Sequence, residues 1–463
     1  MNEPIPAHRI RARFARALSD MYRQEVPKYG TLVDLVRRIN ADTLETRPEL
    51  REQLDLGGDL QRLTEERHGA IRLGLPDELH TMRRLFAVMG MQPVAYYDLS
   101  EAGIPVHSTA FRPLGIDELN ANPFRIFTSL LRLDLIADEA LRARARQLLE
   151  QRRIFTQRVL ELIETAEDRG GLDEAQAEEF VREALQTFRW HREATVDHAT
   201  YRRFLDTHRL VADIVCFKGP HINHLTPRTL DIDRVQREMP DAGLDPKTIL
   251  EGPPPRQHPI LLRQTSFKAL QEAVVFSDGE RGEHRARFGE IEQRGMALTQ
   301  KGRALYDELL EAVRREAPDA VQRPQHYYSV LERVFRAFPD DLDTLRREGL
   351  AFFRYHPGET PAGADTLDGL IAEGALRITP ITYEDFLPVS AAGIFQSNLD
   401  ERETQAIRRS PNQQAFERDL GCPVNSEFEH YAGIQRASLQ QSLQALGLEP
   451  AVADSLLNAL PAA

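Results

Sequence analysis

Residues 91–112 read MQPVAYYDLSEAGIPVHSTAFR, and this stretch decides the class of fold. Two short segments rich in valine, tyrosine and threonine, 91–98 and 105–112, lie on either side of a turn that contains a glycine and a proline. That composition, bounded by turn residues, is typical of neighbouring β-strands. The chain before residue 91 has helical periodicity instead. The change from helix to strand at this point predicts an α+β protein.

Helical segments surround the predicted strands. Apolar residues from Ile10 and Phe14 onward recur at helical spacing, and 138–188 keeps a 3.6-residue period over several turns. The tail of the chain is mostly helical as well. We therefore expect a single catalytic α+β body over 1–463, with a helical insertion at 138–188 and a C-terminal helical segment at 401–463.

The remaining strands are expected in the second half of the chain. LVADIVCF (210–217) predicts a buried strand that runs into the turn-rich sequence KGPHINHLTPR. Further strand-like segments are 259–270, 273–276, 286–295, 350–355 and 375–387. Helices are expected between them, at 299–315, 326–337 and 365–373. Together these segments predict a central antiparallel or mixed sheet wrapped by helices.

Composition excludes several classes of protein. The chain has 463 residues, of which 41% are hydrophobic and 28% charged, as in globular proteins. Its net charge of −13 argues against non-specific nucleic-acid binding, which needs a basic surface. No apolar run approaches the roughly 20 residues of a membrane helix, and residues 1–14, MNEPIPAHRIRARF, contain no apolar core typical of a signal peptide. Two cysteines, Cys216 and Cys422, exclude a disulfide framework. We expect a cytoplasmic protein without membrane or nucleic-acid partners.

Histidines carry the first chemical signals, because the chain lacks a dinucleotide-binding glycine motif, a P-loop, a nucleophile elbow and HExxH. In TEERHGAIRLG (64–74), His68 and Arg72 share one face whether the segment is a strand or a helix. A surface histidine beside a surface arginine is the alternative interpretation. In FKGPHINHLTPR (217–228), His221 and His224 lie in a turn, where sites accumulate. A capping histidine in a satisfied loop is the alternative there.

A carboxylate pair supplies the third signal. In RFGEIEQRG (287–295), Glu290 and Glu292 share one face of a strand. If that face is buried, the carboxylates need a partner; a solvent-facing strand is the alternative. Two histidines and one carboxylate can occupy one face of an octahedral metal, as in the facial triad of non-haem Fe(II) oxygenases. The three contexts therefore indicate an iron site, provided that a sheet brings them together.

Four segments in order, EERHGAIRLG, CFKGPHINHLTPR, FGEIEQRG and LPVSAAGIF (387–395), resemble the 2-oxoadipate dioxygenase/decarboxylase family. The resemblance spans nearly the whole chain. It implies a fold similar to vicinal-oxygen-chelate enzymes, with a central mixed sheet enclosing the metal. It also implies an Fe(II) enzyme that converts 2-oxoadipate and O₂ to 2-hydroxyglutarate and CO₂, a step of lysine degradation.

The resemblance also implies roles for individual residues. The family's metal ligands fall on His68, His224 and Glu292. Its substrate arginine falls on Arg72, and the contacts at the far end of the substrate on Val389 and Ser390. The histidines would also contact the substrate at the metal. Neighbouring groups that could orient the ligands are Glu290, His221 and Asn223.

Two other functions remain open from the sequence. One is a metal-dependent isomerase or lyase of the same fold, which would use the metal as a Lewis acid on another 2-oxo acid. The other is a non-catalytic scaffold whose helical segments bind a partner. Two histidines with one carboxylate favour the oxygenase over the isomerase.

Overall fold

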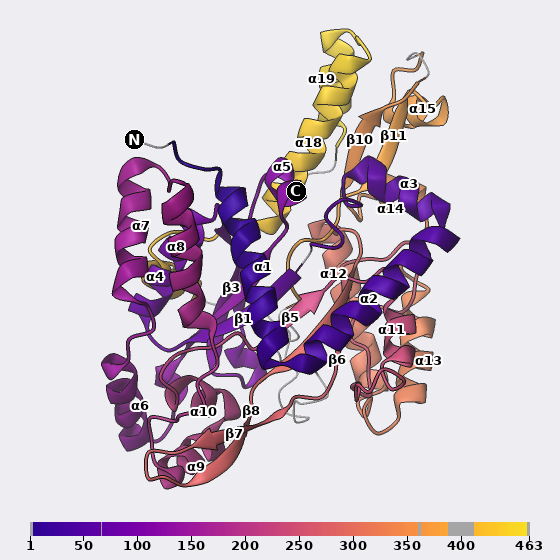
Figure 1. Cartoon of the computed structure of the whole chain (residues 1–463). Helices are drawn as coiled ribbons and strands as arrows, with labels where there is room; N and C mark the ends of the chain where they lie inside the picture. Colours follow the sequence, from indigo (N-terminus) through magenta and orange to yellow (C-terminus); the bar gives the residue numbers. More distant parts are fainter. Residues whose placement is uncertain (1–2, 66, 360–362, 388–411, 461–463) are drawn as a thin grey trace.

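The computed structural model describes residues 3–65, 67–359, 363–387 and 412–460, and within them the central element is a seven-stranded mixed sheet (Figure 1). Its strand order is β2-β3-β4-β1-β5-β9-β6. The pairs β1–β4 and β5–β9 are parallel, and the other neighbours are antiparallel. The strands are β1 (Arg67–Leu73), β2 (Gln92–Asp98), β3 (Val106–Arg112), β4 (Arg125–Leu131), β5 (His224–Pro227), β6 (Leu262–Ser266) and β9 (Phe288–Arg294).

Two smaller sheets and the helices complete the described fold. The two-stranded sheets are β7 (Gln271–Val275) with β8 (Arg281–Arg285) and β10 (Phe353–Pro357) with β11 (Leu376–Pro380). The helices of the first half are α1 (Ala7–Glu25), α2 (Pro27–Thr46), α3 (Pro48–Gly57), α4 (Pro76–Val88), α5 (Ile116–Ala121), α6 (Glu139–Gln151), α7 (Gln157–Arg169), α8 (Glu174–Ala184), α9 (His198–Thr207), α10 (Arg209–Val215) and α11 (Ile232–Glu238). Those of the second half are α12 (Gln300–Glu316), α13 (Pro324–Phe335), α14 (Leu342–Arg347), α15 (Leu367–Ala372), α17 (Gln413–Leu420), α18 (Glu427–Ala445) and α19 (Pro450–Asn458). The predicted α+β class and the mixed sheet are confirmed.

The two faces of the central sheet have different chemistry, because successive side chains of a strand point to opposite sides. On β1, Ile71 belongs to the apolar core that also contains residues of α1 and α2. His68 and Arg72 alternate with Ile71 and therefore point to the other face. On β9, Ile291 joins the same core, so the glutamates on either side of it face the same way as His68. The sheet thus has an apolar face under helices and a buried polar face.

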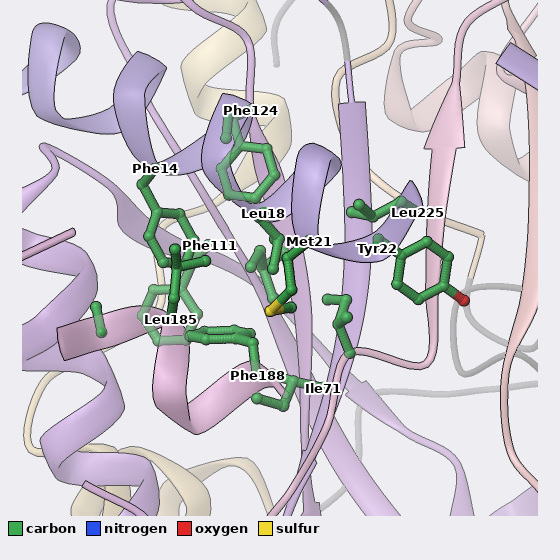
Figure 2. Packing of buried hydrophobic residues seen from close by; sticks show 14 of the residues in the cluster. Phe14, Leu18, Met21, Tyr22, Ile71, Phe111, Phe124, Leu185, Phe188 and Leu225 are labelled. Carbon is green, nitrogen blue, oxygen red and sulfur yellow. The ribbon is translucent and has the colours of Figure 1, made fainter. Parts of the chain in front are cut away.

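Aromatic residues fill the apolar side (Figure 2). Phe14 of α1 packs edge-on against Phe124 and Phe188, with ring centroids 5.9 and 5.2 Å apart. Leu18, one helical turn after Phe14, is fully buried in the same core. Burying such side chains stabilises the fold by roughly 1.5–3 kcal/mol each. This core fixes the strands whose opposite face carries the polar side chains.

Helix caps divide the predicted helical segment 138–188 into α6, α7 and α8. Asp138, Thr156 and Asp173 each accept a hydrogen bond from a backbone N–H of the first turn of the following helix. Gly170 ends α7 with a φ of 72°, in the left-handed region that favours glycine. The predicted helicity is confirmed here, whereas the division of the chain into a body, an insertion and a C-terminal segment stays a prediction.

The strand predicted at 210–217 is wrong. Residues 209–215 form the helix α10, which begins after His208, whose Nδ1 accepts a hydrogen bond from the backbone N–H of Leu210. A short apolar run cannot be assigned to a buried strand or a buried helix by periodicity alone. The consequence matters for the site, because the helix places Asp213 beside β1. No helix within the described ranges has the length and apolarity needed to cross a membrane.

Candidate metal centre

Three adjacent strands bring His68, His224 and Glu290 together. Their ligand atoms all lie within 4.8 Å of one another, and all three residues are fully buried. His68 is on β1, His224 begins β5 and Glu290 is on β9, so the central strand β5 joins the two outer ones. Parallel pairing of β5 and β9 sets His224 opposite Phe288, two residues before Glu290. The sheet thus unites positions that are up to 222 residues apart in sequence.

The cluster has polar atoms that suit a cation. Within the described part of the chain, neither ring nitrogen of His224 has a hydrogen-bond partner, and the same holds for Oε2 of Glu290. Buried polar atoms without partners are uncommon and call for an explanation such as an ion. Burial lowers the pKa of His224 well below its ordinary value, which keeps the imidazole neutral as a metal requires. Two imidazoles and a carboxylate therefore form a site that could hold a metal.

Glu290 is oriented by its neighbours on the sheet. Its Oε1 lies 3.0 Å from Nε2 of His68 and accepts hydrogen bonds from Nε2 of Gln264, at 2.8 Å, and from the hydroxyl of Thr226, at 3.2 Å. Burial raises the pKa of this carboxyl, against the opposing effect of His68. The lost hydration of the anion is thus only partly replaced by these contacts.

Glu292 lies on the other side of the His68 ring. Its Oε2 is 2.9 Å from Nδ1 of His68, and its two oxygens accept hydrogen bonds from Nε and Nη2 of Arg294 at 2.8 and 2.9 Å. Burial alone would raise its pKa, but Arg294 and then His68 outweigh that effect and hold it at about 2. Glu292 is therefore anionic, although the compact three-residue cluster contains Glu290 in its place.

Arg72 lies on the same face of β1 as His68, as the sequence predicts. It is buried, and its Nη1 donates a hydrogen bond of 2.7 Å to Oδ2 of Asp213 on α10. His221 is not among the clustered ligands; its Nε2 lies 3.6 Å from Oδ1 of Asp213 and accepts a hydrogen bond from Nδ2 of Asn223 at 3.1 Å. Val389 and Ser390 fall outside the described residues.

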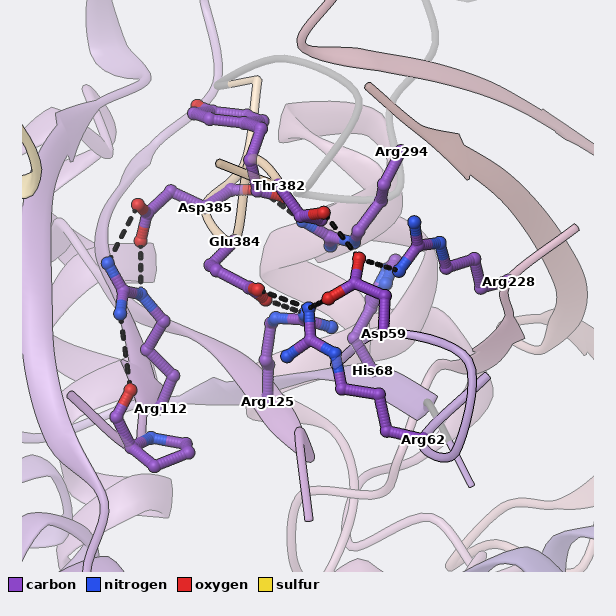
Figure 3. A network of polar contacts seen from close by, with 12 residues as sticks. Asp59, Arg62, His68, Arg112, Arg125, Arg228, Arg294, Thr382, Glu384 and Asp385 are labelled. Carbon is purple, nitrogen blue, oxygen red and sulfur yellow. Dashed lines mark hydrogen bonds and ion pairs between the residues drawn. The ribbon is translucent and has the colours of Figure 1, made fainter. Parts of the chain in front are cut away.

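A network of buried ion pairs borders the centre (Figure 3). Glu384 pairs with both Arg62 and Arg125, and Asp385 accepts two hydrogen bonds from Arg112, at 2.6 and 2.9 Å. Arg125 is the direct neighbour of His68 across the β1–β4 pair. These contacts fix the segment after β11 against the polar face of the sheet.

That segment also places an aromatic ring on a candidate ligand. Phe386 packs edge-on against His68 with ring centroids 4.9 Å apart, and the guanidinium of Arg294 lies 5.6 Å from its ring centre. His224 has a similar neighbour in Phe288, also at 4.9 Å. Each histidine thus has an aromatic wall on one side, which excludes water from the cluster.

A pocket of about 230 Å³ lies beside β9 and β11. Its lining includes Arg228, Arg294 and Glu384. Arg294 also holds Glu292, so the pocket reaches the neighbourhood of the candidate metal centre.

Sequence reasoning missed Asp213, Glu384, Asp385 and Arg125. Asp213 was hidden in an apolar run that predicted a strand. Only five of the 59 basic residues are lysines, so arginine is abundant and a single one stands out little from the sequence. The ion pairs join residues more than 250 positions apart, and no local spacing announces such contacts.

A known protein family and its members match most of the chain. A family model described as 2-oxoadipate dioxygenase/decarboxylase matches residues 14–398. A protein of that name from Pseudomonas putida is 55% identical over 459 residues, covering 96% of this chain and 99% of the relative. The one from Escherichia coli is 54% identical over 451 residues, covering 95% and 98%.

A solved structure gives the same result. The hydroxyglutarate synthase from Pseudomonas putida, crystallised in complex with 2-oxoadipate, superimposes with a TM-score of 0.91 at 53% identity. The match covers 97% of this chain and all of that chain. Family model, relatives and structure agree over nearly the full length, and the chain belongs to the 2-oxoadipate dioxygenase/decarboxylase family.

Proposed function

We propose that this protein is an Fe(II)-dependent dioxygenase that converts 2-oxoadipate and O₂ to 2-hydroxyglutarate and CO₂. The observation that carries the proposal is the buried pair His68 and His224, with Glu290 and Glu292 on the two sides of the His68 ring, in a chain of this family. Two imidazoles and one carboxylate suit Fe(II) and leave coordination positions open. The reaction balances, since one oxygen atom enters the hydroxyl group and the other the new carboxylate, while the old carboxylate leaves as CO₂.

His68, His224 and Glu292 are the proposed ligands. Bound Fe(II) would supply the redox chemistry that couples O₂ reduction to loss of CO₂ from the chelated 2-oxo acid. The charge of Glu292 supports this assignment. A metal ligand must be deprotonated, and Arg294 keeps the pKa of Glu292 at about 2. Burial raises the pKa of Glu290 instead, although Glu290 is the glutamate of the compact cluster. Glu290 then accepts a hydrogen bond from the other ring nitrogen of His68 and fixes the ring.

The rest of the polar face would bind and shield the substrate. Arg72 is proposed to pair with the distal carboxylate, because a planar guanidinium fork matches that group. Val389 and Ser390 are proposed to close the same end. Phe386 and Phe288 keep the ligand rings in dry surroundings, where charge interactions are stronger. A small-molecule dicarboxylic 2-oxo acid and O₂ are thus the proposed reaction partners.

Anaerobic loading with Fe(II), followed by O₂ uptake with a panel of 2-oxo acids, tests the function. We expect O₂ consumption and CO₂ release in equal amounts with 2-oxoadipate, and 2-hydroxyglutarate as the product. Turnover without O₂ would instead assign an isomerase or lyase. If the protein binds no metal and turns over no 2-oxo acid, the result would favour the non-catalytic scaffold.

A further inference from the structure

Asp213 has polar neighbours from three separate parts of the chain. Its Oδ2 accepts the 2.7 Å hydrogen bond from Arg72 on β1, and its Oδ1 accepts one from Nε2 of His284 on β8 at 2.9 Å. Nε2 of His221 lies 3.6 Å from the same Oδ1. Only 5% of the side chain is exposed. A carboxylate with this many charged and polar neighbours is held in one orientation.

The charge of Asp213 is secured by the same neighbours. Burial alone would raise the pKa of Asp213, but the hydrogen bond from His284 and the charge of Arg72 hold it well below its ordinary range, whereas buried His221 is neutral. A buried anion is tolerated when donors satisfy its oxygens, and removal of one partner is costly. Asp213 is therefore a permanent negative charge beside Arg72.

His284, which donates to Asp213, is itself held by two further contacts. The hydroxyl of Tyr201 lies 2.8 Å from Nδ1 of His284, whose other nitrogen faces Asp213. The ring of His284 also stacks parallel to that of Trp190, with centroids 6.2 Å apart and an angle of 4°. The chain Tyr201–His284–Asp213–Arg72 thus runs from the apolar side of α9 to the polar face of β1.

We infer that Asp213 is a positioning residue, which sets the direction of the Arg72 guanidinium for a distal carboxylate of the substrate. The inference rests on the proposed function and on the role proposed there for Arg72. An arginine recognises a carboxylate through a planar fork, so the orientation of the plane decides the strength of the pair. Because Asp213 accepts the hydrogen bond from Nη1 of Arg72, it fixes the plane of the guanidinium.

The position of Asp213 relative to the proposed ligand His224 also supports the positioning role. Asn223, whose Nδ2 lies 3.5 Å from Oδ2 of Asp213, directly precedes the proposed ligand His224. The backbone N–H of Asn223 donates to the carbonyl of Ala70, two residues before Arg72. Asp213 therefore lies where the strand of Arg72 and the loop of His224 meet, and it can fix the distance between the two ends of a bound diacid.

The test compares Asp213→Asn with a matched control in the iron-loaded enzyme. Asp233→Asn is the control, because it makes the same change in a carboxylate of α11 that also accepts two hydrogen bonds from one arginine, Arg263, at 2.6 and 2.9 Å. The readout is the ratio of kcat/KM for 2-oxoadipate to kcat/KM for 2-oxohexanoate, which lacks the distal carboxylate. We expect Asp213→Asn to lower this ratio about tenfold, through KM, with iron content unchanged. Asp233→Asn should leave the ratio at the wild-type value.

A double variant makes the assignment specific. If Asp213 acts through Arg72, adding Asp213→Asn to Arg72→Ala should lower the ratio no further. His284→Phe, which keeps a stacked ring but removes the donor to Asp213, should lower the ratio about threefold in the same direction. This second variant carries the test if Asp213→Asn does not fold.

The outcomes separate the inference from the function beneath it. A ratio that falls in Arg72→Ala but not in Asp213→Asn or His284→Phe would overturn the positioning role and leave that of Arg72. A ratio unchanged in Arg72→Ala would overturn both roles. A wild-type enzyme that consumes O₂ with neither substrate would overturn the proposed function itself.

Discussion

Nδ1 of His68 lies 2.9 Å from Oε2 of Glu292, while the other nitrogen of the same ring faces Glu290 at 3.0 Å. A histidine that binds a metal through one ring nitrogen usually donates a hydrogen bond from the other to a carboxylate or carbonyl oxygen. The two glutamates must therefore divide these roles. One shares the metal with His68, and the other accepts a hydrogen bond from the N–H on the far side of the ring.

Substituting each glutamate by glutamine separates the two roles. We expect Glu292→Gln to lose iron and activity, because a neutral amide replaces the anionic ligand that also balances the charge of Arg294. Glu290→Gln should keep iron at saturating Fe(II) but bind it about 10- to 100-fold more weakly, as for a group that orients a ligand. Iron titration of both purified variants decides the assignment. Retained iron in Glu292→Gln with loss in Glu290→Gln would make Glu290 the ligand.

Removing His224 should abolish metal binding. Its ring nitrogens have no protein partner in the described structure, so His224→Ala breaks no hydrogen bond and the chain should still fold. We expect iron content and O₂ uptake to fall to background. His221→Ala is the control, since this neighbouring histidine faces Asp213 and not the cluster, and it should keep its iron. Full occupancy in His224→Ala would remove that residue from the ligand set.

Much of the fold and part of the site could be predicted from local pattern. The strands within 91–112 were correct because β-branched and aromatic residues alternate there between turn signals. His68 stood out because it shares a face with Arg72, and His221 and His224 because they lie together in a turn; only the family resemblance chose His224 between the two. Glu290 and Glu292 could not be separated, since two residues apart on a strand means the same face. The positions of Arg294, Gln264 and Thr226 distinguish them, and those come from the folded sheet.

Contacts between distant segments could not be predicted. Asp213 follows two apolar residues and an alanine in a run whose period fits neither structure uniquely. Asp213 becomes a partner of Arg72 only in the folded chain, where α10 lies against β1. The same holds for Glu384 and Asp385, which meet arginines from the first third of the chain.

Arg72 should discriminate between diacids and mono-acids. Arg72→Ala should weaken 2-oxoadipate turnover by about 2–5 kcal/mol in kcat/KM, because the distal carboxylate would lose its charged partner in a buried site. Arg72→Lys keeps the charge but loses the planar fork, so a smaller loss is expected. Steady-state kinetics with 2-oxoadipate and 2-oxohexanoate, at equal iron content, measure the difference. An equal loss for both substrates would show that Arg72 acts at the metal end or on folding.

The aromatic core behind the sheet should control stability and not metal affinity. Phe14 is fully buried between Phe124 and Phe188. Phe14→Ala should cost about 3–5 kcal/mol, since it removes apolar contacts and leaves a cavity. A lower urea midpoint, with iron affinity unchanged in the folded protein, is the expected result. Leu135→Ala, at a side chain that is 44% exposed, should change stability by less than about 0.5 kcal/mol. Equal midpoints for the two variants would contradict this account of the core.

His107 predicts a loss of stability in mild acid. Its side chain is buried next to Tyr96 and Phe416, and burial, with a contribution from Arg132, lowers its pKa to about 4. The unfolded chain binds a proton there at about pH 6.5, whereas the folded chain does not until about pH 4. The free energy of unfolding therefore falls as the pH decreases from 6.5 to 4, by about 2 kcal/mol at pH 5 from this residue alone. His107→Gln should remove that contribution, so its urea midpoint should change less between pH 7 and pH 5 than that of the wild type. His326→Gln, at an exposed histidine whose surroundings change little on unfolding, should keep the wild-type dependence. A pH dependence in His107→Gln as steep as in the wild type would mean that the folded protein protonates His107 as readily as the unfolded chain does.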